Sequence, residues 1–218
     1  MYQPPLFRET RPEILHELIR AHPLGLLISV GNDGPVADPL PFLLDADAGS
    51  HGRLLVHMAR ANPQWRIISE NSGKPVMVVF QGVNTYTTPS WYETKRETGK
   101  VVPTWNYAIV QVRGMARIID DRDWLAWQIN ALTEKQESPR ADPWHVSDAP
   151  EDFIESQIKA IIGMEIVIDS IEGKWKVSQN RPAADQKGVI EGLTHEVHTD
   201  AAAEMAELVR RFGKKPAE

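Results

Sequence analysis

The chain of 218 residues contains no cysteine, which excludes disulfide bonds, thiolate metal ligands and a cysteine nucleophile. No apolar run approaches the roughly 20 residues that a membrane-spanning helix needs. The first residues, MYQPPLFRET, carry neither a basic flank nor an apolar stretch, so a signal peptide is not expected. We therefore expect a cytoplasmic protein that makes no membrane contact.

Sequence motifs of several common functional classes are missing as well. There is no G-x-G-x-x-G, P-loop or G-x-S-x-G motif, so nothing supports a dinucleotide fold, a nucleoside triphosphatase or a hydrolase. His195 and His198 lie in HEVH, which is not H-E-x-x-H and has no evident third ligand, so no metal site is expected. The formal net charge of −6 supplies no general attraction to nucleic acid. The basic segment VRRFGKK is the one local candidate for DNA contact, and such a run is more typical of a solvated helix end.

Hydrophobic periodicity and turn residues predict helices mixed with hairpin strands. The predicted strands cover residues 25–30, 36–44, 54–58, 76–80, 109–119 and 164–173. The predicted helices start at a capping box of Thr10 and Glu13, at Asn62-Pro63 and at Asp120-Asp121, include Phe153, Ile154, Ile158 and Ile161, and run from Ala183 to a stop at Gly213.

Two features of this pattern indicate the architecture. Pro35, Pro39 and Pro41 remove backbone donors, so part of strand 36–44 should be an edge or a bulge. Hairpin turns outnumber regular strand–helix–strand units, which predicts an α+β barrel. We expect one domain over residues 1–218, with a helical C-terminal extension from about residue 183.

The stretch from Val76 to Asp120 has the composition of a ligand site. It contains two tryptophans, Trp91 and Trp105, and three tyrosines, among serine, threonine, asparagine and lysine. Aromatic faces beside small polar donors suit a planar, partly polar ligand.

Four blocks in and around this stretch carry a family resemblance. HMARANPQW, TPSWYETK, VVPTWNY and GKWKVSQNRP follow an N-terminal MYQPPLF in this order. Together they resemble the PaiB-type FMN-binding transcriptional regulators, over Met1 to about Leu193. The resemblance implies a split β-barrel of the FMN-binding type with peripheral helices, and a homodimer with FMN at the subunit interface. The family name implies a repressor, which in Bacillus-type bacteria acts on protease and sporulation genes.

The phosphate of FMN needs cationic partners, and Arg60 and Lys95 are the predicted ones. Ser90 and the backbone near Asn62, at a helix start, would assist them. In the alternative interpretation, Arg60 and Lys95 are solvated and Asn62 is only a helix cap. If Arg60 contacts the phosphate, Arg60→Ala should weaken FMN binding by about 1.5 to 3 kcal/mol.

The isoalloxazine ring needs a flat wall and edge hydrogen bonds, and the remaining predicted site residues supply these. The resemblance places the strand that carries His57 and Met58 along the cofactor and adds a C-terminal contribution. The predicted residues are His57 and Met58 on that strand, Trp91 and Trp105 as walls, Thr104 and Asn106 at the ring edge, and Lys176, Ser178, Gln179 and Asn180 at the C-terminal side. The alternatives are core or interface tryptophans, a core histidine at position 57, and ordinary turn chemistry at 178–180.

Three candidate functions follow from the resemblance. The first is an FMN-binding negative regulator whose target is DNA or a partner regulator. The second is an FMN-dependent oxidoreductase, and a binder that has lost its flavin is a third. No proton donor is evident beside the flavin, which argues against an enzyme, while the acidic balance and the lack of a helix-turn-helix argue against direct DNA binding. A helix carrying Trp124 and Trp127 favours the homodimer.

Overall fold

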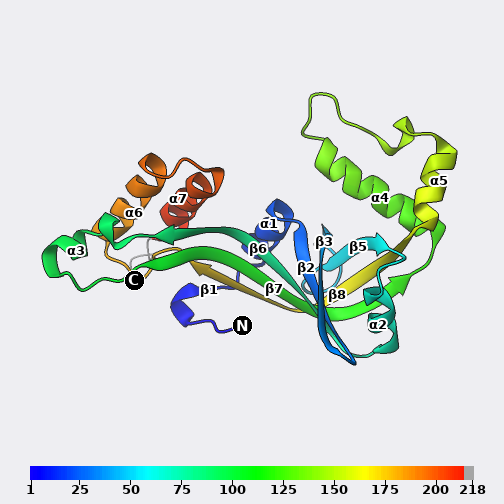
Figure 1. Cartoon of the computed structure of the whole chain (residues 1–218), viewed down its shortest axis with the longest axis horizontal. Coiled ribbons are helices and arrows are strands. Elements are labelled where there is room, and N and C mark those ends of the chain that lie inside the picture. The colour runs from blue at the N-terminus through cyan, green and yellow to red at the C-terminus, as the bar shows by residue number, and fades with distance from the viewer. Residues whose placement is uncertain (214–218) are drawn as a thin grey trace. The chain divides into compact units, whose positions relative to one another are not determined.

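The structure, a computed structural model, describes residues 1–213 (Figure 1). Its strands are β1 Arg8–Glu9, β2 Leu24–Gly31, β3 Gly34–Pro41, β4 Leu43–Asp45, β5 Arg53–Ala59, β6 Val76–Thr87, β7 Thr104–Ile119 and β8 Ile161–Lys176. Its α-helices are α1 Pro12–Ala21, α2 Gln64–Glu70, α3 Glu93–Thr98, α4 Arg122–Glu137, α5 Glu151–Lys159, α6 Ala183–His195 and α7 Asp200–Phe212. Three short 3-10 turns are η1 Pro5–Phe7, η2 Pro89–Trp91 and η3 Val146–Asp148. The predicted α+β class is confirmed.

The strands form one sheet in the order β3-β2-β6-β7-β8-β5-β4, and β1 pairs with β8. The hairpin of β2 and β3 turns at Gly31 to Gly34, as the sequence predicts. Strand β3, which carries three prolines, lies at one end of this order. The prediction that these prolines mark an edge is therefore confirmed, because an edge strand needs fewer backbone donors.

Contacts divide the chain into two compact units. The first unit comprises residues 1–15, 81–110 and the described residues from Glu172 onward, and the second comprises 16–80 and 111–171. Strands β6, β7 and β8 contribute residues to both units. The expectation of a single domain over the whole chain stays a prediction.

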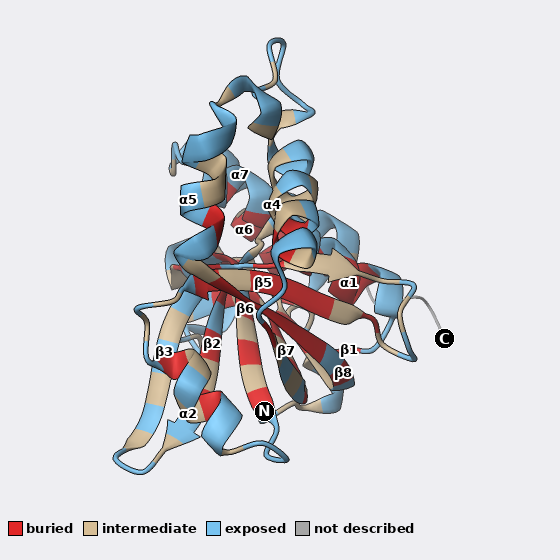
Figure 2. Ribbon diagram, turned by 90° about the vertical axis from the view of Figure 1, so that its right-hand side faces the viewer, coloured by how far each residue is buried: buried red, intermediate tan, exposed pale blue. Residues whose placement is uncertain are grey.

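The second unit contains the barrel. Strands β3 and β4 end the sheet order at opposite sides, yet only Phe42 separates them in the chain. Strand β3 also contacts β5, so the strands close on themselves. Inside, Phe42 meets Phe80 edge to face at 5.6 Å, and Gly25 leaves them room, since a Cβ there would lie 2.7 Å from the Phe80 ring. Figure 2 shows buried residues along the strands and exposed ones on the outer turns of α4 and α5.

The first unit has a core of its own. Helices α6 and α7 contact each other, and their buried side chains include Val189, Leu193, Met205 and Val209. The Nε2 atom of Gln186, also buried, lies within hydrogen-bonding distance of the carbonyl oxygens of Ser178, Arg181 and Gly213 and shares its two protons among them. These contacts tie the end of α7 to the turn that precedes α6.

Several predicted boundaries were wrong for local reasons. Ile161 begins β8 instead of ending a helix. The strand predicted over 36–44 divides at Phe42 into β3, which pairs with β2, and β4, which pairs with β5. Helix α2 begins at Gln64, with the Asn62 side chain accepting the Gln64 amide at 2.8 Å. Helix α1 begins at Pro12, and just before it the amides of Thr10 and Arg11 donate to the Glu9 carboxylate.

The C-terminal end follows the prediction only in outline. The helical segment from Ala183 is two helices, and the second ends at Phe212 with Gly213 as its C-cap, as predicted. The lysines of VRRFGKK, Lys214 and Lys215, lie outside the described residues. Over residues 1–213, no helix has both the length and the apolar composition to cross a bilayer.

Candidate functional site

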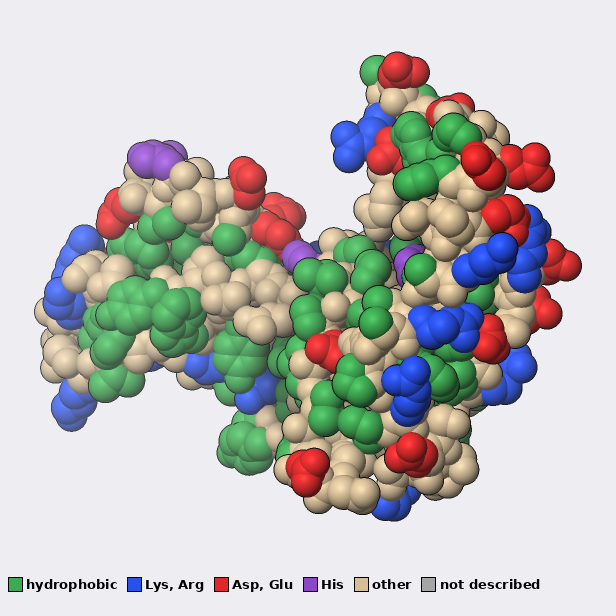
Figure 3. Space-filling model, turned by 45° about the vertical axis from the view of Figure 1, so that its right-hand side comes forward, with side chains coloured by type: hydrophobic (Ala, Val, Ile, Leu, Met, Phe, Trp, Pro, Cys, Tyr) green, Lys and Arg blue, Asp and Glu red, His purple; other side chains and the backbone are tan. Residues whose placement is uncertain are grey.

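An aromatic pair beside a lysine marks the first unit. The Trp105 side chain on β7 is 54% exposed, and its ring meets that of Tyr86 on β6 edge to face, with centroids 6.1 Å apart. Lys176 on β8 donates from Nζ to the Thr104 hydroxyl and, at 2.8 Å, to the carbonyl oxygen of Trp105. Exposed aromatic faces next to a cation suit a planar anionic ligand. Figure 3 shows hydrophobic side chains gathered on this unit with lysine and arginine side chains around them.

A buried polar contact joins β7 to the turn that follows β8. The Asn106 amide donates to the Ser178 hydroxyl at 2.9 Å, and both residues are buried. Ser178 has a φ of 66°, a left-handed conformation that is uncommon for a residue other than glycine. Gln179 accepts the Val177 amide through its side chain, which stabilises this turn, and Asn180 is exposed beyond it.

Trp91 and Lys95 are engaged within the first unit. The Trp91 ring packs on α6 over Gly192, where a Cβ would lie 2.2 Å from the ring, and its Nε1 donates to Glu196 at 2.9 Å. Lys95 donates to the Ser90 hydroxyl at 3.1 Å. Because Trp91 packs against a helix, it fits the alternative of a core residue better than the predicted role of lining the isoalloxazine ring.

Buried polar atoms without partners accompany these residues. In the described part of the first unit, the hydroxyls of Thr85, Thr87 and Tyr92 and one carboxylate oxygen of Asp185 are buried without a hydrogen bond of normal geometry. Burial raises the pKa of the Tyr92 hydroxyl, and the positive charge of Arg181 partly opposes this rise. Burying polar groups unpaired is costly, so such atoms point to a bound water or ligand.

In the second unit, His57 is oriented by α4. Its Nδ1 lies 2.7 Å from Gln128 Oε1, and the Gln128 side chain is 0% exposed. Met58, the next residue, is buried with the other inward-facing residues of β5. The sequence did not single out Gln128, because α4 also carries the amides of Asn130 and Gln136.

The Arg60 side chain forms hydrogen bonds and an ion pair within the protein. Its guanidinium donates twice to Asp120, at 2.7 and 2.8 Å, and once each to the carbonyl oxygens of Lys159 and Ile161. The hydrogen bonds with Arg60 lower the pKa of the Asp120 carboxyl. Asn62 donates to Asp38 at 2.9 Å. The phosphate role of Arg60 stays a prediction, and these contacts give the side chain a structural role of its own.

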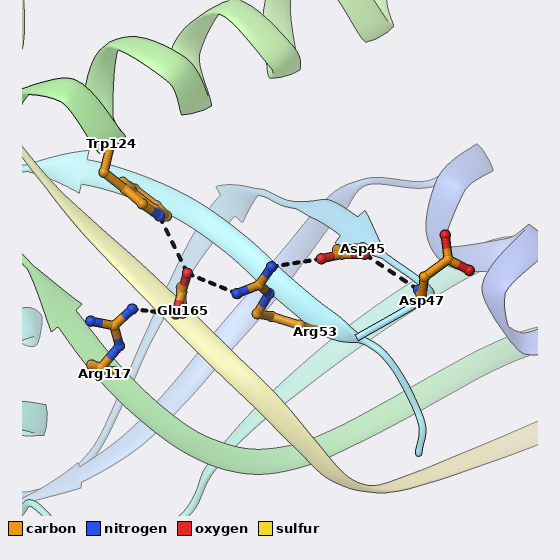
Figure 4. A network of polar contacts seen from close by, with 6 residues as sticks. All are labelled: Asp45, Asp47, Arg53, Arg117, Trp124 and Glu165. Carbon is orange, nitrogen blue, oxygen red and sulfur yellow. Dashed lines mark hydrogen bonds and ion pairs between the residues drawn. The ribbon is translucent and has the colours of Figure 1, made fainter. Parts of the chain in front are cut away.

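A second polar network, which the sequence did not predict, surrounds Glu165 on β8 (Figure 4). Its carboxylate accepts from Arg53 at 3.1 Å, from Arg117 at 2.7 Å and from the Trp124 indole at 3.3 Å. Arg53 also binds Asp45 at 2.7 Å. Glu165 is only 7% exposed, so this carboxylate is a buried charge held by two cations. Within the described residues no histidine and carboxylate cluster could hold a metal ion.

The residues of the first unit fit FMN on chemical grounds. Trp105 and Tyr86 offer exposed aromatic surface, Thr104 and Asn106 offer small polar groups, and Lys176 offers a positive charge without a carboxylate partner among the described residues. The structure brings together Thr104, Trp105, Asn106, Lys176 and Ser178 of the predicted set within this unit. The predicted residues His57, Met58, Arg60 and Asn62 belong to the second unit.

Comparison with known proteins gives relatives over nearly the full length. An uncharacterized protein of Emericella nidulans is 38% identical over 248 aligned positions, covering 98% of both chains. The Bacillus subtilis protein named "Protease synthase and sporulation protein PAI 2" is 33% identical over 215 positions, covering 99% of both. These relatives come from a fungus and a bacterium.

Solved structures show the same fold. The FAD and heme binding protein from Mycobacterium smegmatis superimposes with a TM-score of 0.54 at 18% identity, covering 78% of this chain and 73% of that one. The family described as "Putative FMN-binding domain" matches residues 1–170. The fold is a split β-barrel of the flavin-binding type, and the chain belongs to the FMN-binding domain family, whose cofactor is FMN.

Proposed function

We propose that this protein is an FMN-binding regulator of the PaiB type, acting as a negative regulator through DNA or a partner regulator. The full-length similarity to the Bacillus subtilis protein named for protease synthesis and sporulation carries this proposal. The exposed aromatic pair and Lys176 in the first unit support the flavin part of it. When bound, FMN supplies a ring that accepts one or two electrons, which suits a redox-sensing ligand.

The first prediction is that the purified protein retains FMN. After incubation with FMN and passage through a desalting column, the protein should keep a bound-flavin absorbance spectrum. Trp105→Ala should weaken binding of FMN and riboflavin alike, because both carry the ring that an aromatic side chain would contact. Elution of all the FMN with the small molecules would remove the proposed cofactor role.

Once a flavin complex is in hand, two assays separate the two classes of function. Salt-sensitive binding of promoter DNA would support direct regulation, because phosphate contacts release counterions. Bleaching of the bound flavin by a reduced pyridine nucleotide would instead favour an FMN-dependent oxidoreductase.

The second prediction is a homodimer. On the outer face of β2, the apolar side chains of Leu24, Leu26 and Val30 are exposed, and on α4 the Trp127 ring is half exposed. Exposed apolar residues on one face of a strand favour a protein contact. Light scattering at micromolar concentration should give the dimer mass, and introducing Leu24→Glu with Val30→Glu should shift it to the monomer. A wild-type monomer under these conditions would exclude a stable dimer.

A further inference from the structure

Three cations on the first unit have no carboxylate partner among the described residues. Among residues 1–213, no ion pair involves Lys174, Lys176 or Arg181, which we call the cationic cluster. Burial lowers the pKa of the Lys176 ammonium, and the positive charges of Lys174 and Arg181 lower it further. Lys174 and Lys176 lie two residues apart on β8, so their side chains leave the same face of the strand. Like charges on one face repel one another, and a bound anion would relieve the repulsion.

The hydrogen bonds of the cluster leave donors available. Lys176 gives two of its three ammonium protons to the Thr104 hydroxyl and the Trp105 carbonyl. The Arg181 guanidinium lies over the Tyr92 ring, with Cζ 4.4 Å from the centroid. The Lys174 ammonium lies 5.3 Å from the centroid of the Tyr107 ring. Aromatic faces hold these side chains in place without neutralising them.

The backbone fixes the position of Arg181. Its amide donates to the Ser178 carbonyl at 3.0 Å, and its own carbonyl accepts from Gln186 at 2.9 Å. Two residues later the 13-residue helix α6 begins, and no side chain caps its N-terminus. Asp185 is the opposing charge in the first turn of this helix, and one of its oxygens accepts the Thr94 amide at 2.9 Å.

A comparison of the cationic cluster with Arg60 indicates which of the two suits a phosphate better. Asp120 already neutralises Arg60 and uses two of its donors, whereas the cationic cluster has three positive charges and free donors. Guanidinium and ammonium groups together match the charge and the oxygen atoms of a phosphate dianion. We propose that Lys174, Lys176 and Arg181 form a phosphate-type anion site in the first unit, and that this site holds the phosphate of FMN. The second half of this statement rests on the proposed function.

The test compares FMN with riboflavin, which lacks the phosphate. Equilibrium titrations by flavin fluorescence would use Arg181→Gln and Arg181→Lys, with Arg60→Gln for comparison and Lys187→Gln as the control. Lys187 is a well-exposed cation on α6 that pairs with Glu191. We expect Arg181→Gln to weaken FMN binding at least about tenfold while riboflavin binding is unchanged, and Arg181→Lys to restore most of the loss. Arg60→Gln and Lys187→Gln should leave the preference for FMN over riboflavin intact.

Three results would overturn the inference. These are unchanged FMN binding in Arg181→Gln, equal losses for both flavins, and a preference for FMN that depends on Arg60 instead. If the wild type binds neither flavin, the proposed function fails, and titration with inorganic phosphate decides the site alone. A rise in thermal midpoint with phosphate that Arg181→Gln abolishes would show a site for another phosphorylated ligand. An equal response of both proteins would exclude the site.

Discussion

Gly188→Ala is expected to lower the free energy of unfolding by about 2 to 3 kcal/mol, which is opposite in sign to the change that helix propensity predicts. Alanine is a better helix former than glycine by about 1 kcal/mol, so propensity alone predicts a more stable α6. A Cβ at position 188, however, would lie 1.8 Å from the carbonyl oxygen of Trp91. That atom belongs to the backbone, so relief requires η2 and α6 to move apart. The sign of the change in unfolding free energy therefore shows whether the steric overlap or the helix propensity is the larger effect.

Urea unfolding of the whole chain measures this change. Lys187→Ala is the matched control, because it lies beside Gly188 on the same helix and is well exposed, so its change should stay within about 0.5 kcal/mol. A more stable Gly188→Ala protein would mean that α6 does not pack on η2, and the placement of Trp91 against Gly192 would then fail as well.

Local signals in the sequence predicted much of the fold because the interactions behind them are local. The turn at Gly31 to Gly34 joins neighbouring strands, and Asp121 caps α4 by accepting the Trp124 amide three residues away. The division of strand 36–44 reflects a change of partner strand, because β3 pairs with β2 and β4 pairs with β5. No propensity of residues 36–44 reports that change of partner, so the sequence could not show it.

The residues of the candidate site also fall into those that the sequence could predict and those that only the fold brings together. Family resemblance brought together Asn106 and Ser178, which are 72 residues apart in the chain. It could not show that Asp120, 60 residues away, would occupy Arg60, or that Gln128, 71 residues away, would bind His57. Aspartate and glutamine occur at many surface positions, and only the folded chain selects which of them meets a given cation or imidazole.

Glu165 should matter more to stability than any exposed ion pair of the molecule. Its carboxylate is buried on the barrel and accepts hydrogen bonds from Arg53, Arg117 and Trp124. Glu165→Gln keeps the shape of the side chain but removes its negative charge, and it turns an amide group toward the guanidinium groups of Arg53 and Arg117. Removing one partner of a buried ion pair typically costs 3 to 5 kcal/mol. We expect about 3 kcal/mol here, because Arg53 keeps Asp45 and Arg117 is 70% exposed and so keeps its water.

The order of the losses makes this prediction specific. Arg117→Gln should cost less than about 1 kcal/mol, because the exposed partner loses little hydration in the native state. Glu93→Gln, which breaks the exposed pair with Arg96, should change stability by less than about 0.5 kcal/mol. Urea unfolding of the three variants, compared at equal slope, gives the ranking. If Glu165→Gln unfolded like Glu93→Gln, the carboxylate would be hydrated in solution, and the network around it would not hold α4 to the barrel.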